Sequence, residues 1–443
     1  MKFPVQGLKL RDAVGVWAST PGKLQPLLAP YLRPTLPDGR YLHWDEFRRR
    51  PVPEGITREQ AWAAVKIARN TKVRVPGFVD QHGSAFAFVR VDAIDRALYE
   101  FEQAHFLPEF QSYIADPKLK HDANMRSWLN ALMQNEALSS SVFEGARLST
   151  REQGMEMLRS QRAPVNKGER MVMNNYRAMQ RIVSVKDEPL TVDTLLELHR
   201  MLAEGALDTA RDDGAGRFRR PDEHVVVSDM EGETWFTPPP AAEVAPRVEA
   251  MLAFANSDVN APGDFVHPLV AAITLHFWLA WIHPFVDGNG RLARALFYWR
   301  LLHAGYDIAE YISISSPLLD APSDYYRAFA YTESDEGDLT YFILHQLGVL
   351  KKATEALSRE LKQRIETAEQ LRAVHKEYAT LNARQVALHQ RLAMAPNSYT
   401  TFAEHQAVAG ISLLTARSDL RGLVERGMLK QHRVGHEYRF VLT

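Results

Sequence analysis

The chain contains no cysteine, and this absence excludes several classes of protein at once. Disulfide frameworks and thiolate catalysis are excluded, and a zinc site could use only histidine and carboxylate ligands. Neither sign of charge is in excess, because 53 Lys and Arg residues balance 54 Asp and Glu residues. This balance argues against a whole-surface attraction to nucleic acid or anionic lipid and leaves only a local basic patch open.

Long hydrophobic runs are also missing from the sequence. The first stretch, MKFPVQGLKLRD, lacks the apolar core of a secretory signal. The most apolar segment, Leu269–Ile282, contains His276 and is too short to cross a bilayer. We therefore expect a cytoplasmic protein that has no membrane partner.

A chain of 443 residues is too long for one compact core, and its pattern changes three times. Residues 1–120 form an accessory region in which 84–91 reads as a strand and 91–106 as an amphipathic helix. Residues 121–350 are mainly helical, residues 351–380 form a charged helical connector, and residues 381–443 form a small separate domain. The apolar stripe of the connector would also suit self-association into a homodimer, although the stripe is short.

The central region predicts a series of helices interrupted by one island of extended chain. The helices are expected at 125–146, 151–159, 166–185, 191–204, 242–257, 267–282, 289–305 and 338–350. In the island at 223–240, Val225, Val226 and Val227 pair in a short β-hairpin with Thr234, Trp235 and Phe236 across a Glu-Gly turn at 231–232. Prolines 238–240 then end the hairpin.

The last region predicts three helices followed by a hairpin, an order that resembles a winged helix. Helices are expected at 382–394, after the capping threonines of SYTTFAEHQAVAG, and at 412–427, where Gly427 ends the last one. Residues 382–443 carry eight Lys or Arg and four acidic residues, a net charge of +4. Arg417 and Arg421 share one helix face, which could contact DNA, and binding of a protein is an equal alternative.

The most informative stretch is His283-Pro-Phe-Val-Asp-Gly-Asn-Gly-Arg291, which is followed by Arg294. Pro284 disfavours helical geometry at His283, so the apolar helix ends there and holds the histidine rigidly. Glycines at 288 and 290 lead into a helix N-terminus, whose free N–H groups and positive dipole suit phosphate. Arg291 and Arg294 add two guanidinium groups for phosphate oxygens, and Asp287 supplies a carboxylate of the type that Mg²⁺ binds.

This combination of a base, an anion site and a metal ligand suits phosphoryl or nucleotidyl transfer. A lone histidine after a helix is usually a cap, and a lone DGNG is usually a turn. Here nine specified positions fall within twelve residues, which at average usage has a chance on the order of 10⁻⁹ in such a chain. The sequence contains no GxxxxGK[ST], HExxH or GxSxG pattern, so the common alternative catalytic signatures are absent.

The stretch resembles the Fic family, whose signature HPFxDGNGRxxR is complete here without a substitution. The resemblance covers about residues 120–345 and implies a mainly α, Fic-fold core with a β-hairpin flap, plus the winged-helix-like α+β domain at the end. It implies transfer of AMP from Mg²⁺-bound ATP to a Ser, Thr or Tyr hydroxyl of a target protein, or of the chain itself. His283 would be the base, Asp287 the Mg²⁺ ligand, and the flap would dock the target by β-augmentation.

The other residues of the motif also receive roles from the resemblance. Gly288, Asn289 and Gly290 would cradle the phosphates of ATP, Arg291 would stabilise their charge, and Arg294 would bind the γ-phosphate. Tyr325 and Tyr326 could stack on the adenine, although aromatic pairs on a helix more often belong to a core. The same site could instead remove AMP from a modified protein, or transfer another phosphate-containing group.

Some Fic proteins carry an inhibitory helix with the pattern [S/T]xxxE[G/N], and Ser140 to Gly145 fit it. The helix is expected at about 136–146, where helical spacing places Ser140 and Glu144 on one face. The carboxylate of Glu144 would then hold the Arg294 guanidinium that the γ-phosphate of ATP needs. A second match, Thr332 to Gly337, is interpreted as an acidic loop before the helix at 338. A DNA-bound regulator with a Fic core is the remaining alternative.

Overall fold

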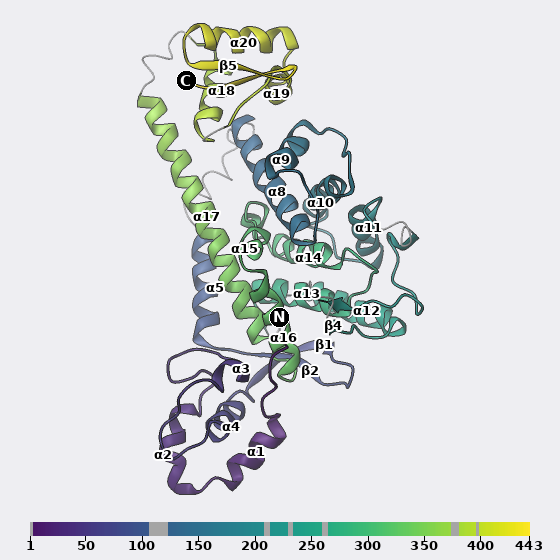
Figure 1. Ribbon diagram of the computed structural model, residues 1–443, viewed down its shortest axis with the longest axis vertical. Coiled ribbons are helices and arrows are strands. Elements are labelled where there is room, and N and C mark those ends of the chain that lie inside the picture. The colour runs from purple at the N-terminus through teal and green to yellow at the C-terminus, as the bar shows by residue number, and fades with distance from the viewer. Residues whose placement is uncertain are drawn as a thin grey trace.

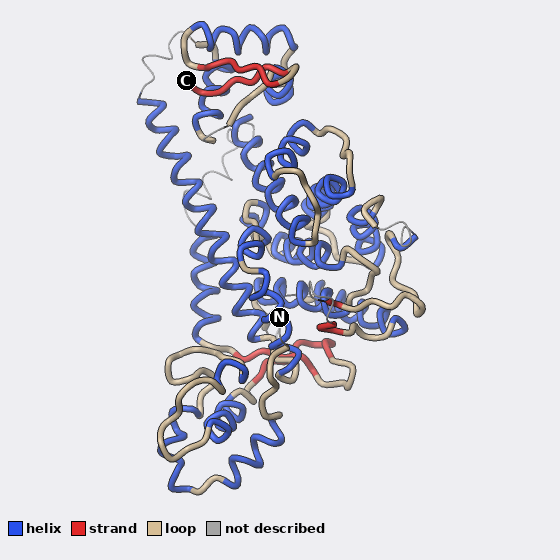
Figure 2. Tube along the Cα trace, viewed as in Figure 1, coloured by secondary structure: helices blue, strands red, loops and turns tan. Residues whose placement is uncertain are grey.

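The computed structural model describes residues 3–105, 123–207, 213–228, 234–258, 265–373, 381–395 and 398–443. Helices dominate these residues, and their strands form three separate two-stranded sheets, which confirms the predicted mainly α fold. Figures 1 and 2 show an elongated molecule with a helical body in the middle and the N-terminal and C-terminal elements at opposite ends. None of the helices in these ranges combines the length and apolar character that a membrane crossing requires.

The N-terminal end of the molecule contains more structure than the sequence predicted. Its four helices are α1 (Leu10–Ser19), α2 (Gln25–Leu28), α3 (Trp44–Phe47) and α4 (Arg58–Ala68). β1 (Lys72–Val79) pairs antiparallel with β2 (Ala85–Val89), and α5 (Asp92–His105) follows. The expected strand at 84–91 and helix at 91–106 are therefore confirmed, whereas α1–α4 and β1 were not predicted. Prolines and short apolar runs hide their periodicity.

The helical body is built around α13 (Pro268–Ile282) and α14 (Asn289–His303), which pack against each other. All of α13 except Ala280 is buried, because a helix that is apolar on every side must lie in a core. The other helices of the body surround this pair: α8 (Ala123–Phe143), α9 (Arg151–Ser160), α10 (Lys167–Ser184), α11 (Val192–Ala203), α12 (Val244–Ala255), α15 (Ser315–Asp320) and α16 (Pro322–Ser334). All of them were predicted within a few residues except α15 and α16.

A single long helix, α17 (Thr340–Ala373), replaces the predicted helix at 338–350 and most of the charged connector that follows. It runs beside α5 and leads from the body toward the C-terminal elements (Figure 1). Leu357 and Leu361 are buried in the main core, so this part of the stripe packs within the chain. Residues 374–380 of the expected connector lie outside the described residues.

The C-terminal elements follow the predicted order of three helices and a hairpin. The helices are α18 (Ala383–Ala393), α19 (Phe402–Ala409) and α20 (Leu413–Glu425), and β5 (Leu429–Val434) pairs antiparallel with β6 (Glu437–Leu442). Thr401 caps α19 by accepting a hydrogen bond from the Glu404 amide at 3.1 Å, as its position predicted. α18 and α19 contact α8, so these elements rest on the helical body.

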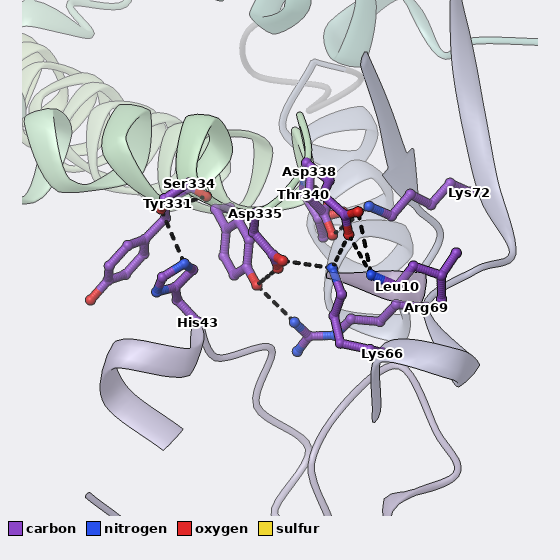
Figure 3. Close-up of polar contacts among 12 residues, drawn as sticks. Leu10, His43, Lys66, Arg69, Lys72, Tyr331, Ser334, Asp335, Asp338 and Thr340 are labelled. Carbon is purple, nitrogen blue, oxygen red and sulfur yellow. Dashed lines mark hydrogen bonds and ion pairs between the residues drawn. The ribbon is translucent and has the colours of Figure 1, made fainter. Parts of the chain in front are cut away.

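A buried polar network attaches the N-terminal end to the body (Figure 3). Lys66 on α4 lies 2.6 Å from Asp335 and 2.7 Å from Glu336, and Arg69 donates a 2.7 Å hydrogen bond to the Tyr341 hydroxyl. The acidic loop predicted at 332–337 is thus only partly correct, because α16 continues through Ser334. Of the loop acids that remain, Asp335 is buried against Lys66, whereas Glu336 pairs with Lys66 but stays exposed.

Candidate functional site

The loop between α13 and α14 turns sharply at both of its ends. His283 caps α13 with a positive φ of 51°, and Gly288 begins the turn into α14 with a φ of 83°, which glycine adopts without strain. Phe285 is fully buried between these points and anchors the loop, as the sequence predicted. The loop is therefore a rigid connection between two buried helices.

Asn289 braces this loop with its side chain. The amide oxygen accepts a 3.0 Å hydrogen bond from the Phe285 backbone N–H, and the amide nitrogen donates a 2.9 Å bond to the Phe285 carbonyl. Both the oxygen and the nitrogen of the side-chain amide are engaged in these two bonds. A phosphate would therefore contact the backbone of Asn289 rather than its side chain. Its contribution to an anion site would come from the N-terminus of α14.

His283 has one imidazole nitrogen engaged and one left over. Its Nδ1 lies 3.1 Å from the Ala280 carbonyl, which can only accept, so Nδ1 carries the proton and Nε2 keeps a lone pair. Burial lowers the pKa of the imidazole, which keeps it neutral at neutral pH. These properties suit a general base.

Arg219 supports the histidine, and the sequence did not indicate this role. Its Nε donates a 2.9 Å hydrogen bond to the His283 carbonyl, and its Nη2 also contacts the Pro239 carbonyl. The arginine therefore connects the end of α13 to the proline segment that follows the hairpin. It lies in a run of basic residues, RFRR at 217–220, which looks like an ordinary solvated surface.

The sequence also did not indicate that His199 on α11 belongs to the site, because a histidine on a helix face is common for purely structural reasons. Its Nδ1 accepts a 3.0 Å bond from the Gly216 amide, so Nε2 donates to the Asp287 carbonyl at 2.9 Å. Its ring stacks on Phe285 with centroids 3.7 Å apart. Burial lowers its pKa to about 4, so it stays neutral and braces the loop.

Arg294 is held by the end of α8. Its Nε donates to the Ser140 hydroxyl at 2.9 Å, and its Nη2 donates to the Ser140 carbonyl at 3.0 Å and to Glu144 Oε1 at 2.9 Å. Burial opposes its charge, but Glu144 and neighbouring groups keep the Arg294 pKa raised. α8 ends at Phe143, so the helices expected at 125–146 and 136–146 are too long. Gly145, with a φ of 84°, terminates α8 earlier than the helical spacing predicted.

The Glu144 carboxylate lies on the first turn of α14. A Cβ atom added to Gly290 would collide with it, so a glycine is required for this approach. The N-terminus of α14 attracts negative charge through its free N–H groups and dipole. Glu144 therefore occupies a position that favours an anion.

Arg291 has hydrogen-bonding capacity to spare. Its Nη1 donates to the Leu202 carbonyl at 2.9 Å, while Nε and Nη2 are buried without a hydrogen-bond partner among the described residues. Nη1 of Arg294 is also buried without a hydrogen-bond partner among the described residues. Burial also lowers the pKa of Arg291. Unsatisfied buried guanidinium donors beside a helix N-terminus fit a ligand that carries several negative oxygens.

Asp287 is the only motif carboxylate and is 44% exposed. Its Oδ1 lies 3.8 Å from Nη2 of Arg291. Within the described residues, no group of three or more His, Asp or Glu could enclose a metal ion. One carboxylate still fits Mg²⁺, because this ion is commonly held by one or two carboxylates together with substrate phosphates.

His283 and the first turn of α14 open into a pocket of about 170 Å³. Its lining includes Glu144, His283, Gly290, Trp235, Tyr326 and Glu333. The two candidate tyrosines differ: Tyr325 is 5% exposed, with its hydroxyl 3.0 Å from Nε2 of His276, whereas Tyr326 is 39% exposed. Tyr326 therefore offers more of its ring to a ligand, and Tyr325 belongs mainly to the core.

The predicted hairpin is present but shorter than expected. β3 (Val227–Ser228) pairs antiparallel with β4 (Thr234–Phe236), and the expected turn lies outside the described residues. Val225 and Val226 are not in the strand, because regular pairing with β4 begins only at Val227. Trp235, Phe236 and Val227 line the pocket, so the hairpin covers it.

Comparison with known proteins agrees with these features. The Fic/DOC family model matches residues 189–301. Two curated relatives named protein adenylyltransferase Fic are similar in part: one from Nematostella vectensis is 32% identical over 36% of this chain and 32% of its own, and one from Drosophila willistoni is 33% identical over 26% and 20%. The chain thus spans a third or less of the length of these relatives.

Two solved structures also resemble the chain. A Fic family protein from Desulfovibrio desulfuricans has a TM-score of 0.49 and 22% identity, covering 80% of this chain and 97% of that one. A fragment of Fic-1 from C. elegans has a TM-score of 0.46 and 19% identity, covering 62% and 72%.

Proposed function

Because the chain contains a Fic/DOC domain at residues 189–301, we propose that it is a protein adenylyltransferase that transfers AMP from ATP to a protein hydroxyl. One observation carries this proposal: a neutral histidine with an available Nε2 and the first turn of α14 line the same pocket, and Arg291 and Arg294 on that helix keep buried guanidinium donors without a hydrogen-bond partner among the described residues. A base beside a polyphosphate site is what nucleotidyl transfer to a hydroxyl requires.

In this reaction His283 Nε2 takes the proton of a Ser, Thr or Tyr hydroxyl on the target. The hydroxyl oxygen bonds to the α-phosphorus of ATP, the bond from that phosphorus to the bridging oxygen breaks, and pyrophosphate leaves. Arg291, Arg294 and the backbone at Gly288–Gly290 would bind the phosphates. Asp287 would hold a Mg²⁺ ion, which supplies positive charge to the phosphates when it is bound.

The contact between Glu144 and Arg294 would make the resting enzyme autoinhibited. The carboxylate uses a guanidinium donor and the helix N-terminus that the γ-phosphate would otherwise use. ATP could then bind only with its phosphates displaced, in a pose unsuited to in-line attack. Release of Glu144 would therefore activate transfer.

The hairpin of β3 and β4 would dock the target. It covers the pocket that contains His283, and an extended target segment could add main-chain hydrogen bonds to its edge. Such bonds align a hydroxyl without reading much sequence. A segment of the chain itself would fit equally, which would give self-modification.

The principal test compares ATP labelled at the α-phosphate with ATP labelled at the γ-phosphate. The proposal expects protein labelling from the α-label only, and loss of that labelling in His283→Ala. Labelling from the γ-label would instead identify a kinase and overturn the proposal. Mass spectrometry of lysate treated with ATP and the Glu144→Gly variant would identify the target through its AMP adduct.

Removal of AMP is a second candidate reaction, because Glu144 and His283 line one pocket and a carboxylate there could align a water molecule. Purified AMP-modified target should then release free AMP in the presence of the wild-type chain. Glu144→Gly should abolish this release, in contrast to its activating effect on transfer.

DNA binding by residues 382–443 is a third candidate. Arg417 and Arg421 are exposed on one face of α20, and Lys430 and Arg433 are exposed on β5. These charges could contact the phosphates of a duplex. A gel shift at low salt with the full chain should then show binding that falls as salt is added, and Arg417→Ala with Arg421→Ala should weaken it.

A further inference from the structure

The carboxyl group of Glu136 on α8 is deeply buried, and no step of the proposed reaction uses it. Glu136 is 1% exposed. Its Oε2 accepts hydrogen bonds from the Ser313 hydroxyl at 2.7 Å and from the Ser315 backbone N–H at 3.0 Å, and its Oε1 accepts one from the Ser315 hydroxyl at 2.6 Å. Because a buried carboxyl group is costly unless its oxygens are satisfied, these three bonds fix α8 against the start of α15.

Neighbouring side chains of α8 extend this contact to Ser316. Asn135 Nδ2 donates to the Ser316 hydroxyl at 3.1 Å, and the Ser139 hydroxyl lies 3.0 Å from the same oxygen. Hydrogen bonds between polar side chains therefore hold this part of α8 against α15. Hydrogen bonds are directional, so a satisfied network fixes a helix in one position more strictly than apolar packing does.

The same side of α8 carries the contact with Arg294. Glu136, Ser140 and Glu144 follow one another at four-residue spacing, which places them along one side of the helix and its end. Ser140 accepts two hydrogen bonds from Arg294, and Glu144 accepts a third at 2.9 Å. Glu144 comes directly after Phe143, the last residue of α8, and its side chain is 26% exposed. Its reach to Arg294 therefore depends on where α8 is held.

We propose that Glu136 is a positioning residue for the inhibitory contact, because its bonds to Ser313 and Ser315 hold α8 where Glu144 reaches Arg294. The inference rests on the proposed function in taking Glu144 as a competitor of the γ-phosphate of ATP. Glu144 is an intramolecular ligand of Arg294, and its effective concentration there depends on how rigidly α8 is held. A looser α8 lowers this concentration and favours the γ-phosphate. Loss of the buried contact therefore tightens ATP binding while it destabilises the fold.

Equilibrium binding tests the inference without requiring any transfer. Calorimetry on the full chain would measure Kd for the α,β-methylene analogues of ATP and of ADP, which lacks the γ-phosphate. Glu136→Leu should tighten binding of the ATP analogue about 2- to 10-fold, the range of the ordering cost of one side chain, and leave the ADP analogue unchanged. In the Glu144→Gly background the same substitution should change neither affinity. A merely structural role would lower Tm without this selective gain.

Three further variants control this measurement. Glu136→Gln keeps an acceptor oxygen, and a serine hydroxyl can rotate to accept from the amide nitrogen, so both affinities should stay within about twofold of the parent. Ser141→Ala removes a buried bond from α8 to the Met171 carbonyl of α10, 3.2 Å long, and should lower Tm without changing either affinity. Ser313→Ala with Ser316→Ala loosens the contact from the α15 side and should tighten ATP binding, even if Glu136→Leu does not fold.

The inference alone is overturned if Glu144→Gly binds the ATP analogue more tightly than the parent while Glu136→Leu and the serine pair do not. If Glu144→Gly brings no gain either, Glu144 does not compete with the γ-phosphate, and the autoinhibition proposal falls together with the inference. If the gains appear as expected while the α-label never reaches protein, the transferase proposal fails and the positioning role of Glu136 stands.

Discussion

Replacing Glu144 with glycine removes the carboxylate that holds Arg294, and two consequences of different sign follow. The side chain of Arg294 is 1% exposed and that of Glu144 is 26% exposed, so the pair is only half shielded from water. Breaking a fully buried pair costs about 3–5 kcal/mol. Since Arg294 keeps its two bonds to Ser140, we expect a loss of about 2 kcal/mol in the free energy of unfolding.

The same interaction competes with the γ-phosphate of ATP, so its removal should activate transfer. A competition worth about 2 kcal/mol corresponds to an increase of about 30-fold in labelling at subsaturating ATP. Mg²⁺ and ATP should also raise the Tm of Glu144→Gly more than that of the wild type, because bound phosphates replace the lost carboxylate. The assay is the initial rate of protein labelling from α-labelled ATP.

Glu152→Gly provides a matched control on the exposed first turn of α9. It also replaces a glutamate near a helix end with glycine but leaves Arg294 paired, so its labelling rate should equal that of the wild type. If Glu144→Gly and Glu152→Gly label protein at the same rate while both bind ATP, the contact with Arg294 is not a brake and the reasoning is refuted.

Other predictions concern the base, its support and the N-terminal attachment. Because burial lowers the His283 pKa, the labelling rate of Glu144→Gly should be constant above pH 7 and should fall only below about pH 6.5. A labelling rate that already decreases between pH 8 and pH 7 would contradict this. Arg219→Lys should reduce the labelling rate about tenfold without changing ATP affinity, since it loosens the histidine and leaves the phosphate site intact. Lys66→Met should lower the free energy of unfolding by about 3–5 kcal/mol, because it leaves the buried Asp335 carboxylate without its ion-pair partner and with the Tyr341 hydroxyl as its hydrogen-bond donor. Adding Asp335→Leu should recover part of that loss, and urea denaturation would measure both.

Local patterns were sufficient for much of the fold. The apolar helix that ends at His283 could be predicted because composition and the following proline act within one or two turns. The capping role of Thr401 and the final hairpin follow from equally short-range signals. The end of α8 was placed too far along because helical spacing alone does not reveal that Gly145 takes a positive φ.

The N-terminal elements and α16 were harder, because their helices are short or begin at proline and their apolar residues are irregularly spaced. Their positions depend on contacts with distant parts of the chain. Lys66 and Asp335, for example, are 269 positions apart in the sequence, and no local pattern predicts that they form an ion pair.

The amino-acid sequence by itself determined the chemistry of the loop: a histidine at a helix end, two glycines at the N-terminus of the next helix, and two arginines on its first turns. These features follow from the steric limits of neighbouring residues, which act over short separations. Only the tertiary structure decided which groups meet there. Glu144 and Arg219 come from elements far from the loop in sequence, and their contacts with Arg294 and His283 arise only when those elements pack together.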